Sequence, residues 1–223
     1  MARPPEQLAP HRPDAAAGFR RLSGDPEAAR EIPTAVRWVH EAGQPFFDWV
    51  IGDRAVTLQT VERWMHRRSS EVSIERAVLL GGRQPVGGFI AVSGAALQRC
   101  RWSDALAAAL AAPARQRPAL IERFSVGRQL FPDVPADALY LSRMGVLPHA
   151  RRKGLGKAMV RHYVELGRRE RFRRFTLDVW SGNVAARALY GSLGFRPSSE
   201  NHAAEAGMTY VRMSLEESRG NHW

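Results

Sequence analysis

The segment from His149 to Met159, HARRKGLGKAM, crowds basic side chains and two glycines between a strand-like run and a helix-like run. The apolar run LYLSRMGVL precedes this segment, and the amphipathic run MVRHYVEL closes it. A helix that begins here presents unpaired N–H groups and the positive end of its dipole to a nearby anion. Glycines leave the backbone open to close approach. The turn therefore predicts a site for an anion such as a phosphate.

The residues that this turn would use are Arg151, Arg152, Lys153, Gly154, Leu155, Gly156 and Lys157. Two familiar phosphate motifs do not fit it. A dinucleotide fingerprint needs a glycine at the position of Met159, and a P-loop needs a serine or threonine at the position of Ala158. An ordinary strand–helix unit with a solvated basic turn stays open as the alternative interpretation.

A second group of residues suited to chemistry lies in the run LDVWSGNVAARALYGSLGFRP. Asn183 precedes Tyr190 by two helical turns, so both side chains fall on one face of the predicted helix. A tyrosine hydroxyl can protonate a departing group as a general acid. The alternatives are a tyrosine that packs its ring in the core and an asparagine that only caps the helix.

Together the two segments resemble the GNAT acetyltransferase superfamily, most strongly over residues 138–214, less over 75–93 and faintly before that. The first family motif, R/Q-x-x-G-x-G/A after a strand, is matched by Arg151, Gly154 and Gly156. The second block, an asparagine and then a helix with a tyrosine before a Gly-Phe turn, is matched by Asn183, Tyr190, Gly194 and Phe195.

The resemblance implies that acetyl-CoA is the cosubstrate. Backbone amides of residues 151–156 would hold its pyrophosphate. The main chain at Met144 and Val146 would pair with the pantetheine arm, and an amide there would polarise the thioester carbonyl as an oxyanion hole does. Asn183 would contribute to cofactor binding, and Tyr190 would protonate the departing thiolate as general acid.

The strand before the turn offers no carboxylate to take the proton of an attacking amine, whose pKa is about 10. Tyr140 and Ser142 lie on this strand, and two-residue alternation predicts that they share a face with Met144 and Val146. A water held by Ser142 or Tyr140 could relay the proton, and Ser142 is our candidate for this relay. Glu71 is a remote candidate, and the base stays unassigned.

The predicted elements are a short strand, helices, an antiparallel hairpin, a β-α-β unit, a helix and a final hairpin. This order predicts an α/β fold with a mixed, mostly antiparallel sheet and helices on both faces. The resemblance adds a V-shaped splay between the strands ALYLSRMGVL and RFTLDVW. We expect a single domain over 18–218, between a disordered extension at 1–17 and a tail at 219–223.

Residues 94–137 have the pattern of a helical insertion. The run SDALAAALAA predicts a helix capped by Ser103 or Asp104, and RPALIERFSVG predicts a second helix that ends at Gly127. The insertion could cover the acceptor opening as a lid, act as a packing element or form a homodimer contact. The run QPFFDWV, Trp64 and Trp180 are candidates for an aromatic wall on the acceptor side, or for core residues.

The composition limits the partners. The formal net charge is +11, yet only two of the 33 basic residues are lysines, and the arginines are scattered along the chain. GC-rich coding explains this pattern better than nucleic-acid binding does, so we expect no nucleic-acid partner. No apolar run reaches the about 18 residues of a membrane span. The seven histidines show no HxxxH or Cys/His spacing, so we expect no metal site. The single cysteine and the lack of an apolar export signal at the start indicate a cytoplasmic protein.

The resemblance, together with these residues, implies an enzyme that transfers an acetyl group from acetyl-CoA to a primary amine by direct attack within a ternary complex. The alternative is a catalytically weak GNAT-like module that binds acyl-CoA or nucleic acid in a regulatory role. Transfer of a longer acyl group also stays open. The acceptor could be a polyamine, an antibiotic, an amino acid, a peptide N-terminus or a lysine side chain.

Overall fold

The computed structural model describes residues 18–22, 25, 27–82 and 84–217, so the extension predicted at 1–17 and the tail predicted at 219–223 lie outside the described residues. Within them, seven strands form one sheet in the order β1-β2-β3-β4-β5-β7-β6. The strands are β1 (Phe19–Arg21), β2 (Ala77–Leu80), β3 (Gly87–Ser93), β4 (Ala138–Val146), β5 (Arg174–Trp180), β6 (Arg196–Ala203) and β7 (Met208–Glu216).

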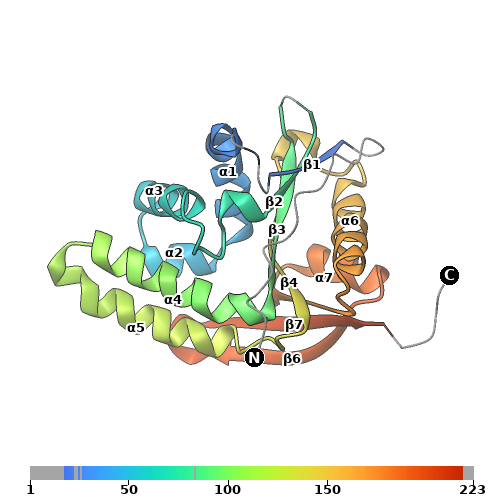
Figure 1. Ribbon diagram of the computed structural model, residues 1–223. Coiled ribbons are helices and arrows are strands. Elements are labelled where there is room, and N and C mark those ends of the chain that lie inside the picture. Colours follow the sequence, from blue (N-terminus) through green and yellow to red (C-terminus); the bar gives the residue numbers. More distant parts are fainter. Residues whose placement is uncertain (1–17, 23–24, 26, 83, 218–223) are drawn as a thin grey trace, which may run out of the picture.

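Helices cover both faces of this sheet, as the sequence predicts. The α-helices are α1 (Ile32–Ala42), α2 (Phe46–Ile51), α3 (Arg54–Met65), α4 (Gly94–Ala111), α5 (Arg117–Leu130), α6 (Leu155–Arg169) and α7 (Val184–Ser192). Helices α1 to α5 lie on one face, and α6 and α7 lie on the other (Figure 1). We call the buried apolar cluster under α1–α5 the first core, and the one under α6 and α7 the second core.

The two central strands separate along their length, which confirms the predicted splay. β4 and β5 are the parallel pair of the sheet, and their pairing runs only from Ala138 opposite Arg174 to Leu141 opposite Leu177. Beyond that point β4 continues against β3, while β5 continues against β7 as far as Trp180. The second half of β4 therefore leaves its β5 side unpaired, at the end where the chain enters α6.

β4 contains an extra residue where it separates from β5. Ala91 of β3 lies opposite Leu141, but the next residue, Ile90, lies opposite Arg143. Ser142 therefore has no partner across the strand pair, which is the arrangement of a β-bulge. A bulge bends its strand and increases the local twist, so the bulge and the splay occur at the same place.

The bulge makes one sequence prediction wrong. Tyr140 belongs to the first core, whereas Met144 and Val146 pack against the second core. The expectation that Tyr140 and Ser142 share a face with Met144 and Val146 assumed an unbroken two-residue alternation. One extra residue shifts the alternation by one, so the side chains after the bulge reverse their faces.

Helix α1 lies against the sheet at two glycines. A Cβ atom on Gly145 of β4 would stand 2.9 Å from the backbone oxygen of Trp38, and one on Gly88 would stand 3.1 Å from the Trp38 ring. Trp38 is fully buried in the first core. The missing side chains therefore allow α1 to approach the half of β4 that lies beyond the splay.

The insertion is helical as predicted, but both helix boundaries differ from the prediction. α4 begins at Gly94, directly after β3, and Ser103 and Asp104 lie inside the helix rather than at its cap. A Cβ atom on Gly94 would stand 2.0 Å from the backbone oxygen of Pro135, so glycine allows this junction. α5 continues past Gly127 because that glycine packs against the ring of Phe46 instead of ending the helix.

We predict that Gly145→Ala lowers the free energy of unfolding by about 2 kcal/mol, as measured by urea denaturation. The added methyl group would meet the main chain of α1 rather than the end of a flexible side chain, so the helix must move.

The matched control is Gly191→Ala in α7, where nothing lies within 4 Å of the added Cβ atom. This change should be neutral or stabilise by up to about 1 kcal/mol, because alanine favours the helix. A Gly145→Ala protein as stable as the wild type would show that α1 does not rest on this glycine.

Candidate functional site

Helix α6 begins without a side-chain cap. Its N-cap residue, Gly154, has φ of +76°, and no side chain accepts a hydrogen bond from the first turn. Arg152 also has a positive φ, +62°. Two left-handed residues so close together curl the chain, and backbone N–H groups in such a turn form a concave anion site. The amides at the start of α6 are thus left for a ligand.

The side chains of the turn divide into two groups. Arg151, Arg152, Lys153 and Lys157 are all exposed. Arg151 differs in its contacts: it donates from Nε to the Val146 oxygen at 2.8 Å and forms an ion pair with Glu41 of α1. Its own amide donates to the Pro148 oxygen at 3.3 Å. Arg151 therefore ties the turn to the end of β4 and to α1, whereas the other three cations face solvent.

Gly156 has a packing role that the sequence does not reveal. A Cβ atom there would stand 3.1 Å from Cδ2 of Leu189 on α7. Leu155 and Leu189 both pack against the second core. The first turn of α6 is therefore in contact with the helix that carries Tyr190. At Gly154, in contrast, a Cβ atom would meet nothing within 4 Å, and glycine is favoured there by its positive φ.

Tyr190 is buried in the second core, where its ring packs against Phe195 with the ring centroids 6.0 Å apart. Burial raises the pKa of its hydroxyl. Burial also raises the pKa of Tyr163, and the Tyr140 and Tyr190 hydroxyls add to this shift. Within the described residues, the Tyr190 hydroxyl makes no hydrogen bond. It is therefore a protonated group that can still donate.

Asn183 is the N-cap of α7. Its side-chain oxygen accepts a hydrogen bond from the amide of Ala186 at 3.1 Å, and the residue is exposed. The helix-cap interpretation of Asn183 is confirmed. Its side-chain NH2 group is not used by this cap.

On the α1–α5 side of the splay, Ser142 meets Glu71 from the loop after α3. The Ser142 hydroxyl donates to Oε1 of Glu71 at 2.6 Å, and Arg101 donates to Oε2 at 3.2 Å. Arg143 approaches Oε1 at 3.5 Å. Burial alone would raise the pKa of Glu71, but the two arginines outweigh it and the pKa is lowered. Glu71 is thus close to the bulge, as an ionised partner of two cations.

A second buried carboxylate, which the sequence analysis missed, lies beside the first. Asp178 of β5 is held by Arg212 of β7, with Nε to Oδ1 at 3.0 Å and Nη2 to Oδ2 at 2.9 Å. The Tyr140 hydroxyl donates to the same Oδ2 atom at 3.1 Å. Charged residues in the middle of the apolar runs FTLDVW and YVRM were the available signal, because a buried charge needs a partner.

The end of the insertion is attached to these same arginines. Arg212 donates to the backbone oxygens of Asp133 at 2.8 Å and Pro132 at 2.7 Å. Arg101 donates to the backbone oxygen of Phe131 at 3.0 Å. The ring of Phe131 then packs against Tyr210 of β7, with the centroids 4.7 Å apart. The insertion thus contributes a wall beside the splay.

The other aromatic candidates separate into core and surface. Trp64 is buried in the first core, and its indole N–H donates to the backbone oxygen of Asp104. Trp180, at the end of β5, is 40% exposed and folds over Gly182. Phe46 packs edge-on against Phe131, with the centroids 4.9 Å apart.

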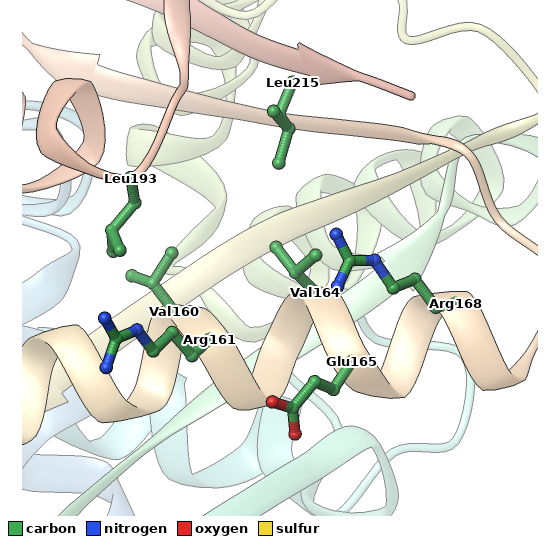
Figure 2. Close-up of a pocket in the computed structure, with 7 residues that line it drawn as sticks. All are labelled: Val160, Arg161, Val164, Glu165, Arg168, Leu193 and Leu215. Atoms are coloured by element: carbon green, nitrogen blue, oxygen red, sulfur yellow. The ribbon is translucent and has the colours of Figure 1, made fainter. Parts of the chain in front are cut away.

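A surface hollow of about 150 Å³ lies elsewhere, between α6, the C-terminal end of α7 and β7. Figure 2 shows Val160 and Val164 of α6 facing Leu193 and Leu215 across it, with charged side chains at its rim. None of the predicted site residues lines this hollow. It is separate from the splay and from the start of α6.

Comparison with known proteins finds a family match over part of the chain and a shared fold. Residues 105–195 match the family model described as the acetyltransferase (GNAT) family. An N-acetyltransferase from Staphylococcus aureus Mu50 has a similar structure, with a TM-score of 0.66 and 14% identity over 88% of this chain and 99% of that one. The matched segment and the shared fold confirm the predicted resemblance to the GNAT family.

Two further solved structures share the fold. A ribosomal-protein-alanine N-acetyltransferase from Brucella melitensis has a TM-score of 0.55 and 14% identity over 89% of this chain and 99% of that chain. An IAA acetyltransferase from Bacillus cereus ATCC 14579 has a TM-score of 0.51 and 13% identity over 89% of this chain and 98% of that chain. Among curated proteins, the sequence has no match.

Two other features of the described residues bear on partners. No three His, Cys, Asp or Glu side chains among them come together in a group that could hold a metal ion. None of the helices in this part of the chain combines the length and apolar character needed to cross a bilayer.

Asp104 of α4 holds the loop that carries Glu71. Its Oδ2 atom accepts from the Glu71 amide at 2.8 Å and from the Ser70 hydroxyl at 3.0 Å. Its Oδ1 atom is buried without a partner. Burial raises the pKa of Asp104 to about 7, against 3.8 for a free aspartate. The folded protein therefore favours the neutral form of this carboxyl.

We predict that Asp104 makes the protein less stable as pH rises. A carboxyl with a raised pKa stabilises the fold relative to the unfolded chain at low pH, and this contribution is lost as pH rises toward its folded value. Between pH 5 and 8 the free energy of unfolding of the wild type should fall by about 2 kcal/mol relative to that of Asp104→Asn, whose side chain carries no charge. Urea denaturation across this range measures the difference, and parallel pH profiles for the two proteins would contradict it.

Proposed function

We propose that the protein transfers an acetyl group from acetyl-CoA to a primary amine. The observation that carries this proposal is the uncapped start of α6, placed directly after the half of β4 that is not paired with β5. A diphosphate and an extended thiol-bearing arm need those two features side by side. The match of residues 105–195 to the GNAT family model and the names of the similar structures support the same reaction.

The residues present suit this cosubstrate. Amides at the start of α6 would bind the pyrophosphate, and the exposed cations Arg152, Lys153 and Lys157 would neutralise it. The unpaired side of β4 at Met144 and Val146 would pair with the pantetheine arm. The carbonyl of the thioester would then lie near the bulge, where a main-chain amide can polarise it.

The reaction we propose is direct transfer. The neutral amine nitrogen attacks the thioester carbonyl carbon, a C–N bond forms, and the C–S bond breaks with its electron pair on sulfur. The Tyr190 hydroxyl supplies a proton to the departing thiolate. Burial raises its pKa, so the hydroxyl is protonated before the step, and it makes no hydrogen bond within the described residues. The nitrogen loses its extra proton to water, and Tyr190 is reprotonated from solvent before the next cycle.

Removal of the amine proton is the step with the least support from side chains. Glu71 is paired with two arginines and Asp178 with one, so arginines already balance the negative charge of both carboxylates. Ser142 donates a hydrogen bond to Glu71, so its oxygen can accept a hydrogen bond from a water or an amine. We propose this serine as the relay that orients the water.

The engagement of both carboxylates is also the observation that favours the second candidate function. A GNAT-like module that binds acyl-CoA in a regulatory role would need the start of α6 but no base. Turnover with any amine separates the two candidates, and a free-thiol assay for released CoA measures it.

We predict that CoA raises the melting temperature of the wild type and that Gly154→Glu removes this shift. A carboxylate at the start of α6 would occupy and repel the diphosphate site. Differential scanning fluorimetry with and without CoA measures the effect. A CoA concentration of about 1 mM fills the site even if binding is weak.

The matched control is Gly154→Asn. Asparagine tolerates the left-handed backbone of this position better than most residues, and nothing lies within 4 Å of its Cβ atom. It should fold and keep the shift. If CoA raised the melting temperature of Gly154→Glu as much as that of the wild type, the pyrophosphate would not bind at this turn.

We also predict that Tyr190→Phe lowers kcat by about 100-fold with little change in the affinity for acetyl-CoA. The hydroxyl makes no hydrogen bond within the described residues, so its loss should leave the stability close to that of the wild type. Steady-state kinetics with a good acceptor, together with urea denaturation, test both statements. Turnover at the wild-type rate would exclude the general-acid role.

A further inference from the structure

We infer that the acceptor carries a carboxylate and that Arg143 binds it. This inference rests on the proposed transferase function and names the class of amine that the same site accepts. Arg143 follows the bulge residue Ser142 directly and lies at the point where β4 leaves β5. Because the bulge reverses the alternation, its side chain lies on the α1–α5 side, opposite Met144 and Val146.

The guanidinium of Arg143 is held in place but only partly used. It lies over the ring of Phe47, 4.8 Å from the centroid, and Nη1 donates to the Ser142 backbone oxygen at 2.7 Å. Its Nε atom is buried without a hydrogen-bond partner. Within the described residues its hydrogen bonds all come from Nη1 and none from Nη2. The Nε–Nη2 edge, which fits a carboxylate, is therefore unpaired.

The same chain shows how this edge is normally satisfied. Arg212 directs its Nε and Nη2 atoms at the two oxygens of Asp178, at 3.0 and 2.9 Å. A carboxylate from a ligand would pair with Arg143 in the same bidentate way. Leaving the buried Nε atom without a partner costs free energy, so the unpaired Nε needs an explanation.

The charges around the splay also favour an anionic acceptor group. Glu71 is shared between Arg101 and Arg143, while Asp178 is matched by Arg212. The cluster thus carries one positive charge more than it has carboxylates. An acceptor whose only charge is an ammonium group would be repelled, whereas a carboxylate balances the excess.

The walls near Arg143 are aromatic. Phe47 lies beneath its guanidinium, and Tyr210 is close enough for Arg143 to affect its hydroxyl. Burial raises the pKa of Tyr210 to about 12, and Arg143 lowers it in part. Phe131 packs against Tyr210 and against Phe46. The acceptor class that fits these groups is an amine with an apolar or aromatic body and a carboxylate.

The test compares acceptors that differ only in the carboxylate. The pairs are L-phenylalanine with 2-phenylethylamine, and 4-(aminomethyl)benzoate with benzylamine, each with saturating acetyl-CoA and detection of the released thiol. In the wild type, kcat/KM should be at least about 10-fold higher for the carboxylate member of at least one pair, because a charged hydrogen bond contributes that much or more.

Variants at position 143 assign the preference to its side chain. Arg143→Gln should lower kcat/KM for the carboxylate acceptor by about 100-fold, mostly through KM, and leave its decarboxylated partner within about threefold. Arg143→Lys keeps the charge but not the planar edge and should fall between the two. Arg123→Gln, at an exposed residue of α5, removes one charge away from the splay and should change neither acceptor.

A role for Arg143 in fixing the bulge alone would reduce activity with both members of a pair equally, which would overturn the inference. A binding measurement does not depend on turnover: on the CoA-loaded wild type, N-acetyl-L-phenylalanine should bind more tightly than N-acetyl-2-phenylethylamine by calorimetry. Acetylation of amines without a carboxylate preference in either measurement would refute this inference and leave the transferase function standing. A protein that neither binds CoA nor acetylates any amine would contradict both.

Discussion

The organisation of this protein depends on one extra residue in a central strand. Ser142 has no partner in β3, and the strand that contains it stops pairing with β5 at Leu141. Without the bulge, β4 would keep its alternation and could stay in register with β5. With it, main-chain groups of β4 become available to a ligand, and consecutive side chains at 142 and 143 reach the same side of the sheet. The splay, the proposed thioester site and the unpaired arginine edge therefore share one cause.

A second constraint is the pairing of charge in a poorly solvated place. Two carboxylates and three arginines meet where the sheet opens, and their connections span α4, β4, β5, β7 and the loop after α3. Each pair is expensive to bury and expensive to break, so the network fixes the relative positions of these elements. It also fixes the insertion, because Arg212 and Arg101 hold backbone oxygens at its end.

The sequence predicted the helices and strands well wherever the hydrophobic periodicity agreed with the capping and turn residues at their ends. The uncapped turn before α6, the asparagine cap of α7 and the order of the strands follow from local patterns. The bulge could not be predicted, because nothing in LYLSRMGV distinguishes an extra residue from an ordinary alternation. The partners of Glu71 were hidden for another reason: contacts between residues 71, 101, 142 and 143 depend on tertiary packing. Asp178 and Arg212 were visible as charges in apolar strands, but the sequence does not show that they pair with each other.

The contact between Gly156 and Leu189 has a consequence for the order of events. Leu189 immediately precedes Tyr190, so the turn that would receive the diphosphate packs closely against the part of α7 that carries the Tyr190 hydroxyl. Binding of the cosubstrate would then also orient the Tyr190 hydroxyl. Such a coupling favours an order of binding in which the cosubstrate binds first. The amine would then bind where the thioester and the Tyr190 hydroxyl are already aligned.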